Sequence, residues 1–227
     1  MSELVSYKNN GAVSVITLDD GKANSLSPTM IKAINHALDQ AENDKATIML
    51  TGREGKFCAG FDLSVFQQGG DALAEMLSDG AKLAQRLMSY PAPVVIASNG
   101  HALAMGALLL LVADYRIGAQ GSFKIGLNEV SIGMTMPAMG IEIARYALSP
   151  QYFRRSLANA EIYSPEKAVG AGFLDEVVAL ENLSARAEEK ALELSKLNRG
   201  AFKGTKLRAR KDALDALRAA IEKNFRA

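Results

Sequence analysis

Cysteine, histidine and tryptophan are scarce or absent in this sequence, and each shortage excludes a class of chemistry. A single cysteine, Cys58, allows no internal disulfide and is typical of a reducing compartment. The two histidines, His36 and His101, lie far apart and have no cysteine or acidic ligands at a useful spacing, so no metal site is predicted. Neither a Gly-x-x-x-x-Gly-Lys-Ser/Thr phosphate loop nor a Gly-x-Ser-x-Gly nucleophile elbow occurs.

Long apolar runs and an excess of either charge are also missing. The longest apolar run is far shorter than the roughly 20 residues that span a bilayer. The first residues show neither an apolar signal core nor an arginine-rich presequence. The 26 basic and 25 acidic residues nearly cancel, which argues against a nucleic-acid partner or an acidic membrane surface. We therefore expect a soluble, cytoplasmic protein that binds neither nucleic acid nor membrane.

The 227 residues suffice for one large domain, or for one domain with an appendage. Strand-like runs alternate with helix-like segments up to Val178. The remainder is rich in alanine, leucine, lysine and glutamate, and predicts two helices that break near residues 198–200. The sequence therefore predicts an α/β fold, with a core over residues 1–178 and a C-terminal helical extension over residues 179–227.

The chain is organised around residues 93–129. Residues 93–97 form an apolar run that predicts a buried strand, and residues 106–113 carry no charge and predict a short, fully buried helix. The loop that enters this helix presents unpaired backbone N–H groups, which suit a developing anion. One acid, Glu129, follows after a further strand and turn. The pattern predicts an oxyanion site with a single acid/base.

A second functional candidate is the apolar, glycine-containing turn at residues 57–63, which leads from a strand into a helix. Cys58 in this turn could be a nucleophile, but no histidine lies near it in sequence, so we interpret it as a packing residue. His101 is interpreted as structural within a turn, and His36 as a solvated side chain on a polar helix face.

Four short motifs follow one another along the chain: ANSL at 23–26, CAGFDL at 58–63, NGHA at 99–102 and ADYRI at 113–117. In this order and spacing they resemble the successive signatures of the crotonase, or enoyl-CoA hydratase/isomerase, superfamily. The resemblance covers about residues 12–178. It implies a crotonase-like spiral of repeated ββα turns, a C-terminal helical region that takes part in trimerisation, and acyl-CoA or enoyl-CoA thioester substrates. It also implies a homotrimer or a dimer of trimers, and no separate cofactor, because coenzyme A is part of the substrate.

The resemblance also assigns site residues by position. It implies that the backbone N–H groups of Phe61 and Met105 hold the thioester oxygen as the enolate forms. The family usually has glycine at position 105; methionine keeps the N–H, although a positive φ there would strain it. Ala23 is expected to offer its carbonyl to the adenine of coenzyme A. The segment that lines the pantetheine and thioester path comprises Ala59, Gly60, Phe61, Asp62 and Leu63.

Hydratases of this family carry two glutamates, one of them in the buried helix after the oxyanion turn. That position is Leu108 here, and the remaining acid is Glu129, which is similar to the mitochondrial-type Δ3-Δ2-enoyl-CoA isomerases that work with one glutamate. Shifting a double bond needs only removal of a proton at C2 and its return at C4, which one carboxylate can shuttle. Apolar neighbours such as Leu108, Val130 and Ile132 should raise the pKa of Glu129. We therefore predict an isomerase.

Two other functions stay open from the residues alone. One is a hydratase or another crotonase-type acyl-CoA lyase or hydrolase, whose missing acid comes from Glu75 or Asp79 on a predicted helix at residues 71–90. The other is a non-catalytic acyl-CoA-binding protein that kept the fold, in which Glu129 only caps a turn or pairs with a surface lysine.

The end of the chain is strongly basic. Residues 199–226 contain nine basic and three acidic side chains, a net charge of +6. One interpretation is a solvated helix face. The other is that one or more basic side chains meet the phosphates of coenzyme A, on the same subunit or on a neighbour. The candidates are Lys203, Lys206, Arg208 and Arg210.

Overall fold

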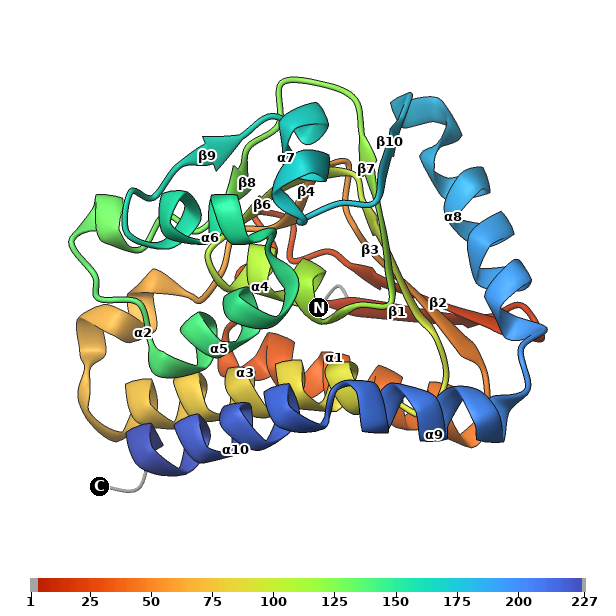
Figure 1. Cartoon of the computed structure of the whole chain (residues 1–227), viewed down its shortest axis with the longest axis horizontal. Helices are drawn as coiled ribbons and strands as arrows, with labels where there is room; N and C mark the ends of the chain where they lie inside the picture. Colours follow the sequence, from red (N-terminus) through yellow and green to blue (C-terminus); the bar gives the residue numbers. More distant parts are fainter. Residues whose placement is uncertain (1–3, 226–227) are drawn as a thin grey trace.

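The strands of this protein form two sheets (Figure 1). The computed structural model describes residues 4–225, so Arg226 of the basic tail lies outside the described residues. In the larger sheet, β1 is antiparallel to β2, and the other neighbours are parallel. Its strands are, in spatial order, β1 (Val5–Asn9), β2 (Val13–Leu18), β3 (Thr47–Gly52), β5 (Val94–Ser98), β7 (Tyr115–Ala119) and β10 (Glu176–Val178).

The smaller sheet contains the strands that lie, along the chain, between strands of the larger sheet. It comprises β4 (Gly55–Cys58), β6 (Gly100–Leu103), β8 (Ile125–Gly126) and β9 (Ile162–Tyr163). From β3 to β8 the chain alternates between the two sheets, and each pair of strands is followed by helical segments. The spiral of ββα turns implied by the family resemblance is therefore confirmed.

Helices fill the space beside the sheets (Figure 1). The first, α1 (Pro28–Asn43), starts at Pro28, because the Ser27 side chain accepts from the Met30 N–H and proline occupies the first turn. The helices of the following ββα turns are α2 (Leu63–Gln68), α3 (Gly70–Ser89), α4 (Met105–Val112) and α5 (Ala138–Ala147), with a short 3₁₀ turn, η1 (Val130–Ile132), before α5. All eight residues of α4 are buried, as its uncharged sequence predicts.

Three helices, not two, follow the last strand. They are α8 (Leu180–Ser195), α9 (Arg199–Ala209) and α10 (Lys211–Phe225), preceded by the smaller α6 (Pro150–Leu157) and α7 (Pro165–Ala171). The prediction missed the second break, at Arg210, because no glycine or proline marks it. Leu183 and Ala187 of α8 pack on the larger sheet, whereas Leu214 and Leu217 of α10 join the main core.

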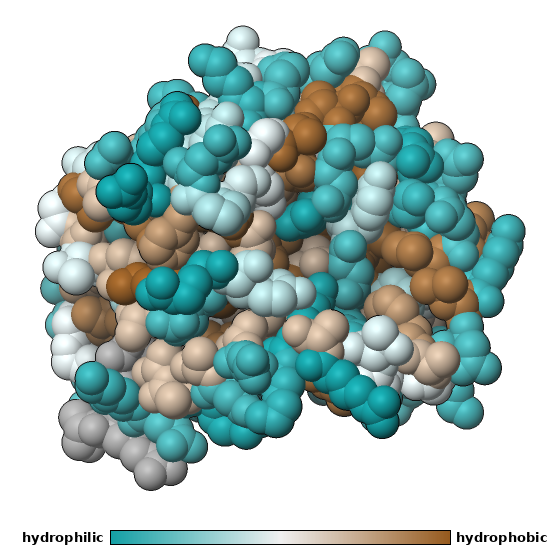
Figure 2. All heavy atoms as spheres, viewed as in Figure 1, coloured by the Kyte–Doolittle hydropathy of each residue, from teal (hydrophilic) through white to brown (hydrophobic). Residues whose placement is uncertain are grey.

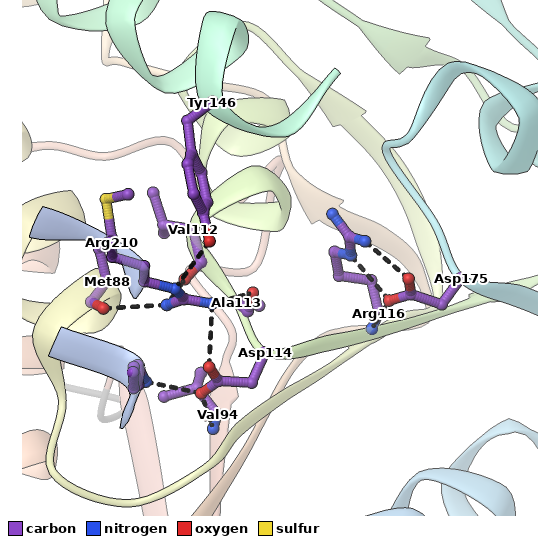
Figure 3. A network of polar contacts seen from close by, with 10 residues as sticks. Met88, Val94, Val112, Ala113, Asp114, Arg116, Tyr146, Asp175 and Arg210 are labelled. Atoms are coloured by element: carbon purple, nitrogen blue, oxygen red, sulfur yellow. Dashed lines mark hydrogen bonds and ion pairs between the residues drawn. The ribbon is translucent and has the colours of Figure 1, made fainter. Parts of the chain in front are cut away.

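Besides the apolar packing of α10, one largely buried acid, Asp114, binds the basic tail to the core (Figure 3). The Lys206 ammonium lies 2.6 Å from Asp114 Oδ2 and the Arg210 guanidinium 2.9 Å from Oδ1, while the Val94 N–H also donates to Oδ2. Arg210 donates in addition to the carbonyl oxygens of residues 88, 112 and 113. Burial lowers the pKa of Lys206 to about 8, although Asp114 opposes this effect.

The predicted role of Lys206 and Arg210 in binding coenzyme A phosphates is therefore wrong. The two residues are four apart on successive helical turns, so they share a face that turns inward, and only 6% and 8% of their surfaces are exposed. Lys203 and Arg208 point outward and are exposed, so the prediction survives only for them. Within residues 4–225, no helix is long and apolar enough to cross a membrane.

Candidate active site

A mainly apolar hollow, with about 580 Å³ of empty space when the open solvent at its mouth is included, contains the predicted acid/base. Glu129 is the only ionisable side chain among the described residues that line it. The lining residues are Ala59, Phe61, Leu63, Phe66, Leu77, Ala104, Met105, Leu108, Asn128, Glu129, Ile132, Met134, Pro137 and Met139. The turn after β4, the start of α4 and the segment after β8 thus meet at one place.

The turn after β4 is fixed by the loop that precedes α1. The Ala59 N–H donates to the Ala23 carbonyl at 3.1 Å, and the Leu26 N–H donates to the Gly60 carbonyl at 2.8 Å. Leu26 and Phe61 also pair as an isolated parallel bridge. The Ala23 carbonyl keeps a second lone pair, so it remains able to accept from a ligand. These bonds explain why the 23–26 and 58–63 motifs act as one structural unit.

The start of α4 supplies the second backbone segment. Ala104, immediately before the helix, has φ +50°, and its N–H donates to the Gly126 carbonyl at 3.0 Å. The positive φ therefore lies one residue before Met105, so methionine is not strained there. As the first residue of the helix, Met105 carries a backbone N–H for which the helix itself provides no acceptor.

The two backbone segments touch at Gly60. Gly60 has φ +94°, and a Cβ added to it would lie 2.8 Å from the Ala104 Cβ and 3.3 Å from the Met105 nitrogen. Gly106 is equally confined, because its added Cβ would lie 2.1 Å from the Cys58 carbonyl oxygen. Phe61 and Met105 are thereby brought to one wall of the hollow. Their role as oxyanion donors stays a prediction.

Glu129 lines the same hollow and has an unpaired carboxylate oxygen among the described residues. The residue is 6% exposed, and within the described part of the protein its Oε2 is buried without a hydrogen-bond partner. Burial raises the pKa of Glu129 to about 6, despite a bond from its own backbone N–H. Of the three apolar neighbours expected to cause this, Leu108 and Ile132 line the hollow, whereas Val130 does not. The side chain neither caps η1 nor pairs with a lysine among the described residues.

Asn128 is a polar member of the site that the sequence did not reveal. It lines the hollow beside Glu129, and its Oδ1 is buried without a partner among the described residues. Its backbone carbonyl accepts from Ser131 Oγ at 2.7 Å. An asparagine before a glutamate is ordinary turn chemistry, so nothing in the sequence distinguished it.

Several residues that were predicted to belong to the site lie outside the hollow. Asp62 does not line the hollow; its carboxylate caps α2 by accepting from the Ser64 N–H at 2.9 Å. Glu75 and Asp79 are exposed and lie outside the hollow, and Asp79 pairs with Lys82. The idea that either supplies a second acid to this site is therefore wrong, because their helix turns other residues, such as Leu77, toward it.

The remaining reactive side chains are structural. Cys58 is buried, which raises the pKa of its thiol to about 12 and makes a thiolate nucleophile unfavourable. His101 Nδ1 accepts from the Lys124 N–H at 2.9 Å, and burial lowers the pKa of the imidazole. His36 is exposed on α1. Within residues 4–225, no group of three histidine, cysteine, aspartate or glutamate side chains could hold a metal ion.

Comparison with known proteins agrees with this geometry. The chain is 30% identical to the enoyl-CoA delta isomerase 1, mitochondrial, of Mus musculus, over 98% of this chain and 80% of the mouse protein. It is 29% identical to a probable enoyl-CoA hydratase of Bacillus subtilis, over 81% of this chain and 70% of that protein. An enoyl-CoA hydratase/isomerase family protein from Pseudomonas syringae has a similar crystal structure, with a TM-score of 0.97 and 50% identity, covering 99% of this chain and 97% of that one.

The names of these relatives include both an isomerase and a hydratase, so they agree on the family rather than on one reaction. The family model described as enoyl-CoA hydratase/isomerase matches residues 8–227, nearly the whole chain. Two sheets joined by ββα turns, with a buried glutamate and the start of a buried helix lining one hollow, fit that match. This protein is a member of the enoyl-CoA hydratase/isomerase family.

Proposed function

We propose that this enzyme is a Δ3-Δ2-enoyl-CoA isomerase with Glu129 as its only acid/base. The observation that supports this most directly is the composition of the hollow, in which Glu129 is the one ionisable side chain among the described lining residues. The place where the family's hydratases carry their other glutamate is Leu108, which is 1% exposed. Adding water benefits from two acid/base groups, whereas moving a double bond needs one.

In this mechanism the thioester oxygen accepts from the N–H groups of Phe61 and Met105. Glu129 removes a proton from C2, the enolate oxygen carries the negative charge, and the protonated Glu129 returns the proton at C4. Each backbone donor is worth about 2.7–4 kcal/mol by analogy with oxyanion donors elsewhere. A carboxyl pKa of about 6 suits a group that must both take and give a proton near neutral pH.

Substrate binding follows from the same assignment. Ala23 and the segment from Ala59 to Leu63 would hold the adenine and pantetheine ends of coenzyme A. Ala59, Phe61 and Leu63 line the hollow. Coenzyme A belongs to the substrate, so the proposed reaction needs no separate cofactor.

Incubation of the purified enzyme with 3-enoyl-CoA and, separately, with 2-enoyl-CoA tests the proposal. We expect migration of the double bond and little addition of water. Glu129→Gln keeps the shape of the side chain but cannot take a proton, so we expect kcat to fall by ~10²–10⁴-fold, with acyl-CoA affinity within a few-fold. The matched control is Glu75→Gln, which neutralises an exposed acid outside the hollow and should retain full activity.

Other outcomes identify other functions. A Glu129→Gln enzyme with more than about a tenth of the wild-type rate contradicts a single-base mechanism. Dominant hydration of 2-enoyl-CoA identifies a hydratase, release of free coenzyme A identifies a hydrolase, and binding without turnover identifies a non-catalytic acyl-CoA-binding protein.

A further inference from the structure

Another cavity, the tail cavity, lies where the helical tail meets the larger sheet. Its walls come from the segments that lead into β2, β3 and β5, from the end of α8 and from the first turn of α9. It has about 370 Å³ of empty space when the open solvent at its mouth is included, and among the described residues it shares none with the active-site hollow. Figure 2 shows apolar surface beside hydrophilic side chains over the region where α8 runs toward α9 in Figure 1.

Thr47, the first residue of β3, brings a buried hydroxyl to the tail cavity. The residue is 3% exposed, and its hydroxyl has no hydrogen-bond partner among the described residues. Side chains alternate along a strand, so Thr47 lies on the same face of the sheet as Met49, which packs with Leu183 and Ala187 of α8. Buried hydroxyls are nearly always hydrogen-bonded, so this one points to a partner from outside the chain.

Both ionisable residues of the described lining are cations, Lys45 and Arg199. One N–H of the Arg199 guanidinium donates to the Lys45 carbonyl, which ties the start of α9 to the segment before β3 and leaves further guanidinium donors available. The first turn of α9 adds backbone donors. Asn198 Oδ1 accepts from the Ala201 N–H at 2.9 Å, whereas the N–H groups of Arg199 and Gly200 have no acceptor within the helix. The polar side of the tail cavity therefore suits an anion.

The remainder of the lining is apolar. Six residues of this kind, among them Leu194 and Phe202, form most of the wall. Apolar walls would take water from an inorganic phosphate without replacing its hydrogen bonds, whereas they gain from burying the carbon chain of an organic acid.

We propose that the tail cavity binds a small organic carboxylate with an apolar body of a few carbons. The carboxylate lies at Arg199, Lys45 and the start of α9 and accepts from the Thr47 hydroxyl, and the carbon chain lies against Leu194 and Phe202. The ligand thus joins the sheet to the helical tail. This inference is independent of the proposed function, because the tail cavity shares no described lining residue with the active-site hollow.

Calorimetric titration of the whole chain with butanoate, at constant ionic strength, tests the inference without turnover. We expect saturable binding of butanoate, and weaker binding of uncharged butanamide and of inorganic phosphate. Thr47→Val keeps the branched shape and removes the hydroxyl, so the affinity for butanoate should fall about ten-fold, because a hydrogen bond to a charged group is lost. The stability of the ligand-free variant should not fall, since the hydroxyl has no partner to lose. The matched control is Thr205→Val, an exposed threonine of α9 outside the tail cavity, which should keep the affinity.

Two further measurements locate the ligand. Lys45→Gln should weaken butanoate but not butanamide, whereas Lys167→Gln, at an exposed site on α7, should change neither. Butanoate should also slow amide hydrogen exchange at residues 45–48 and 198–202 of wild-type protein, and less so in Thr47→Val.

Absence of saturable butanoate binding overturns the inference. So does a Thr47→Val affinity equal to that of wild type, because butanoate then binds elsewhere, for example in the active-site hollow. Equal binding of butanoate and butanamide would show that the tail cavity does not select an anion, and tighter binding of phosphate would show that it does not select an apolar body. Either result also contradicts the inference.

Discussion

At the scale of single residues, the acid/base role proposed for Glu129 combines two requirements that oppose each other. A base must be ionised to accept a proton, yet burial among apolar side chains disfavours its charged form. The protein keeps the carboxylate 6% exposed and provides its Oε2 with no partner among the described residues. The buried, unpaired carboxylate lowers the free energy of unfolding, and the size of this loss depends on pH.

The first prediction at this scale concerns that cost. Folding raises the pKa of Glu129 from 4.5 to about 6, so between these values the folded protein binds more protons than the unfolded chain. The contribution of Glu129 to the free energy of unfolding is thus fully present below pH 4.5. About 2 kcal/mol of it is lost as the pH rises through 6. Glu129→Gln stays neutral and should exceed wild type in free energy of unfolding by about 2 kcal/mol at pH 7.5.

Urea titrations at one fixed protein concentration check this, because association would otherwise shift the result. The advantage of the glutamine variant should shrink to near zero at pH 4.5, and Glu75→Gln should show no such change. An advantage of the same size at both pH values would mean that its origin is packing rather than charge.

A second residue-scale prediction concerns the position of the absent acid. Leu108→Glu should not create an efficient hydratase, because a carboxylate at this 1% exposed site is desolvated and stays protonated. The substitution also crowds α5, since an added Cβ at Gly140 already lies 3.3 Å from Leu108. We expect a loss of about 2–5 kcal/mol in stability and little hydration of 2-enoyl-CoA. Leu108→Gln is the control of equal size, and rapid hydration by a well-folded glutamate variant would contradict the single-acid assignment.

At the scale of elements, one carboxylate binds two cations of the helical tail. Asp114, at the start of β7, is the shared acceptor for cations on α9 and at the α9–α10 junction (Figure 3). Its own side chain is 11% exposed, and those of its two partners are 3% and 9% exposed. A buried network of this kind adds little over apolar packing but is costly to break, because the remaining charges stay buried.

Asp114→Asn should therefore cost about 3–5 kcal/mol in the free energy of unfolding. Adding Lys206→Met should recover part of that loss, because it removes one of the two stranded cations. The control is Asp215→Asn, which breaks an exposed pair with Lys211 and should change stability by no more than about 0.5 kcal/mol. If Asp114→Asn and the control proved equally mild, the tail would be held by apolar packing alone.

At the scale of the whole molecule, we propose the homotrimer, or dimer of trimers, that the family resemblance implies. Large apolar side chains remain exposed on segments outside the active-site hollow, among them Val169, Leu180, Leu192 and Leu197, and association would cover such surface. The chain has a mass of 24.2 kDa, so sedimentation should show a species of three or six times this value. A species with the mass of one chain would contradict the proposal.

In the larger sheet, β5 was predictable because residues 93–97 are an apolar run that ends at a turn. The smaller sheet was not, since β8 and β9 have two residues each and show no alternation. Glu129 and the helix at Leu108 were found because a lone acid and an uncharged run are local signals. The inward face of the tail and the place of Asn128 in the hollow were missed, because each depends on residues distant in sequence.

The contact between Gly60 and the start of α4 has a consequence for how this protein can vary. In the proposed mechanism the hydrogen-bond donors belong to the main chain and are encoded by no particular side chain, so Phe61 and Met105 can be exchanged for any residue that fits, except proline. The restriction falls instead on Gly60 and Gly106, which donate nothing to the proposed reaction but leave no space for a Cβ. The restriction on the sequence therefore lies at Gly60 and Gly106, beside the proposed donors. A comparison of the side chains at Phe61 and Met105 would not detect it.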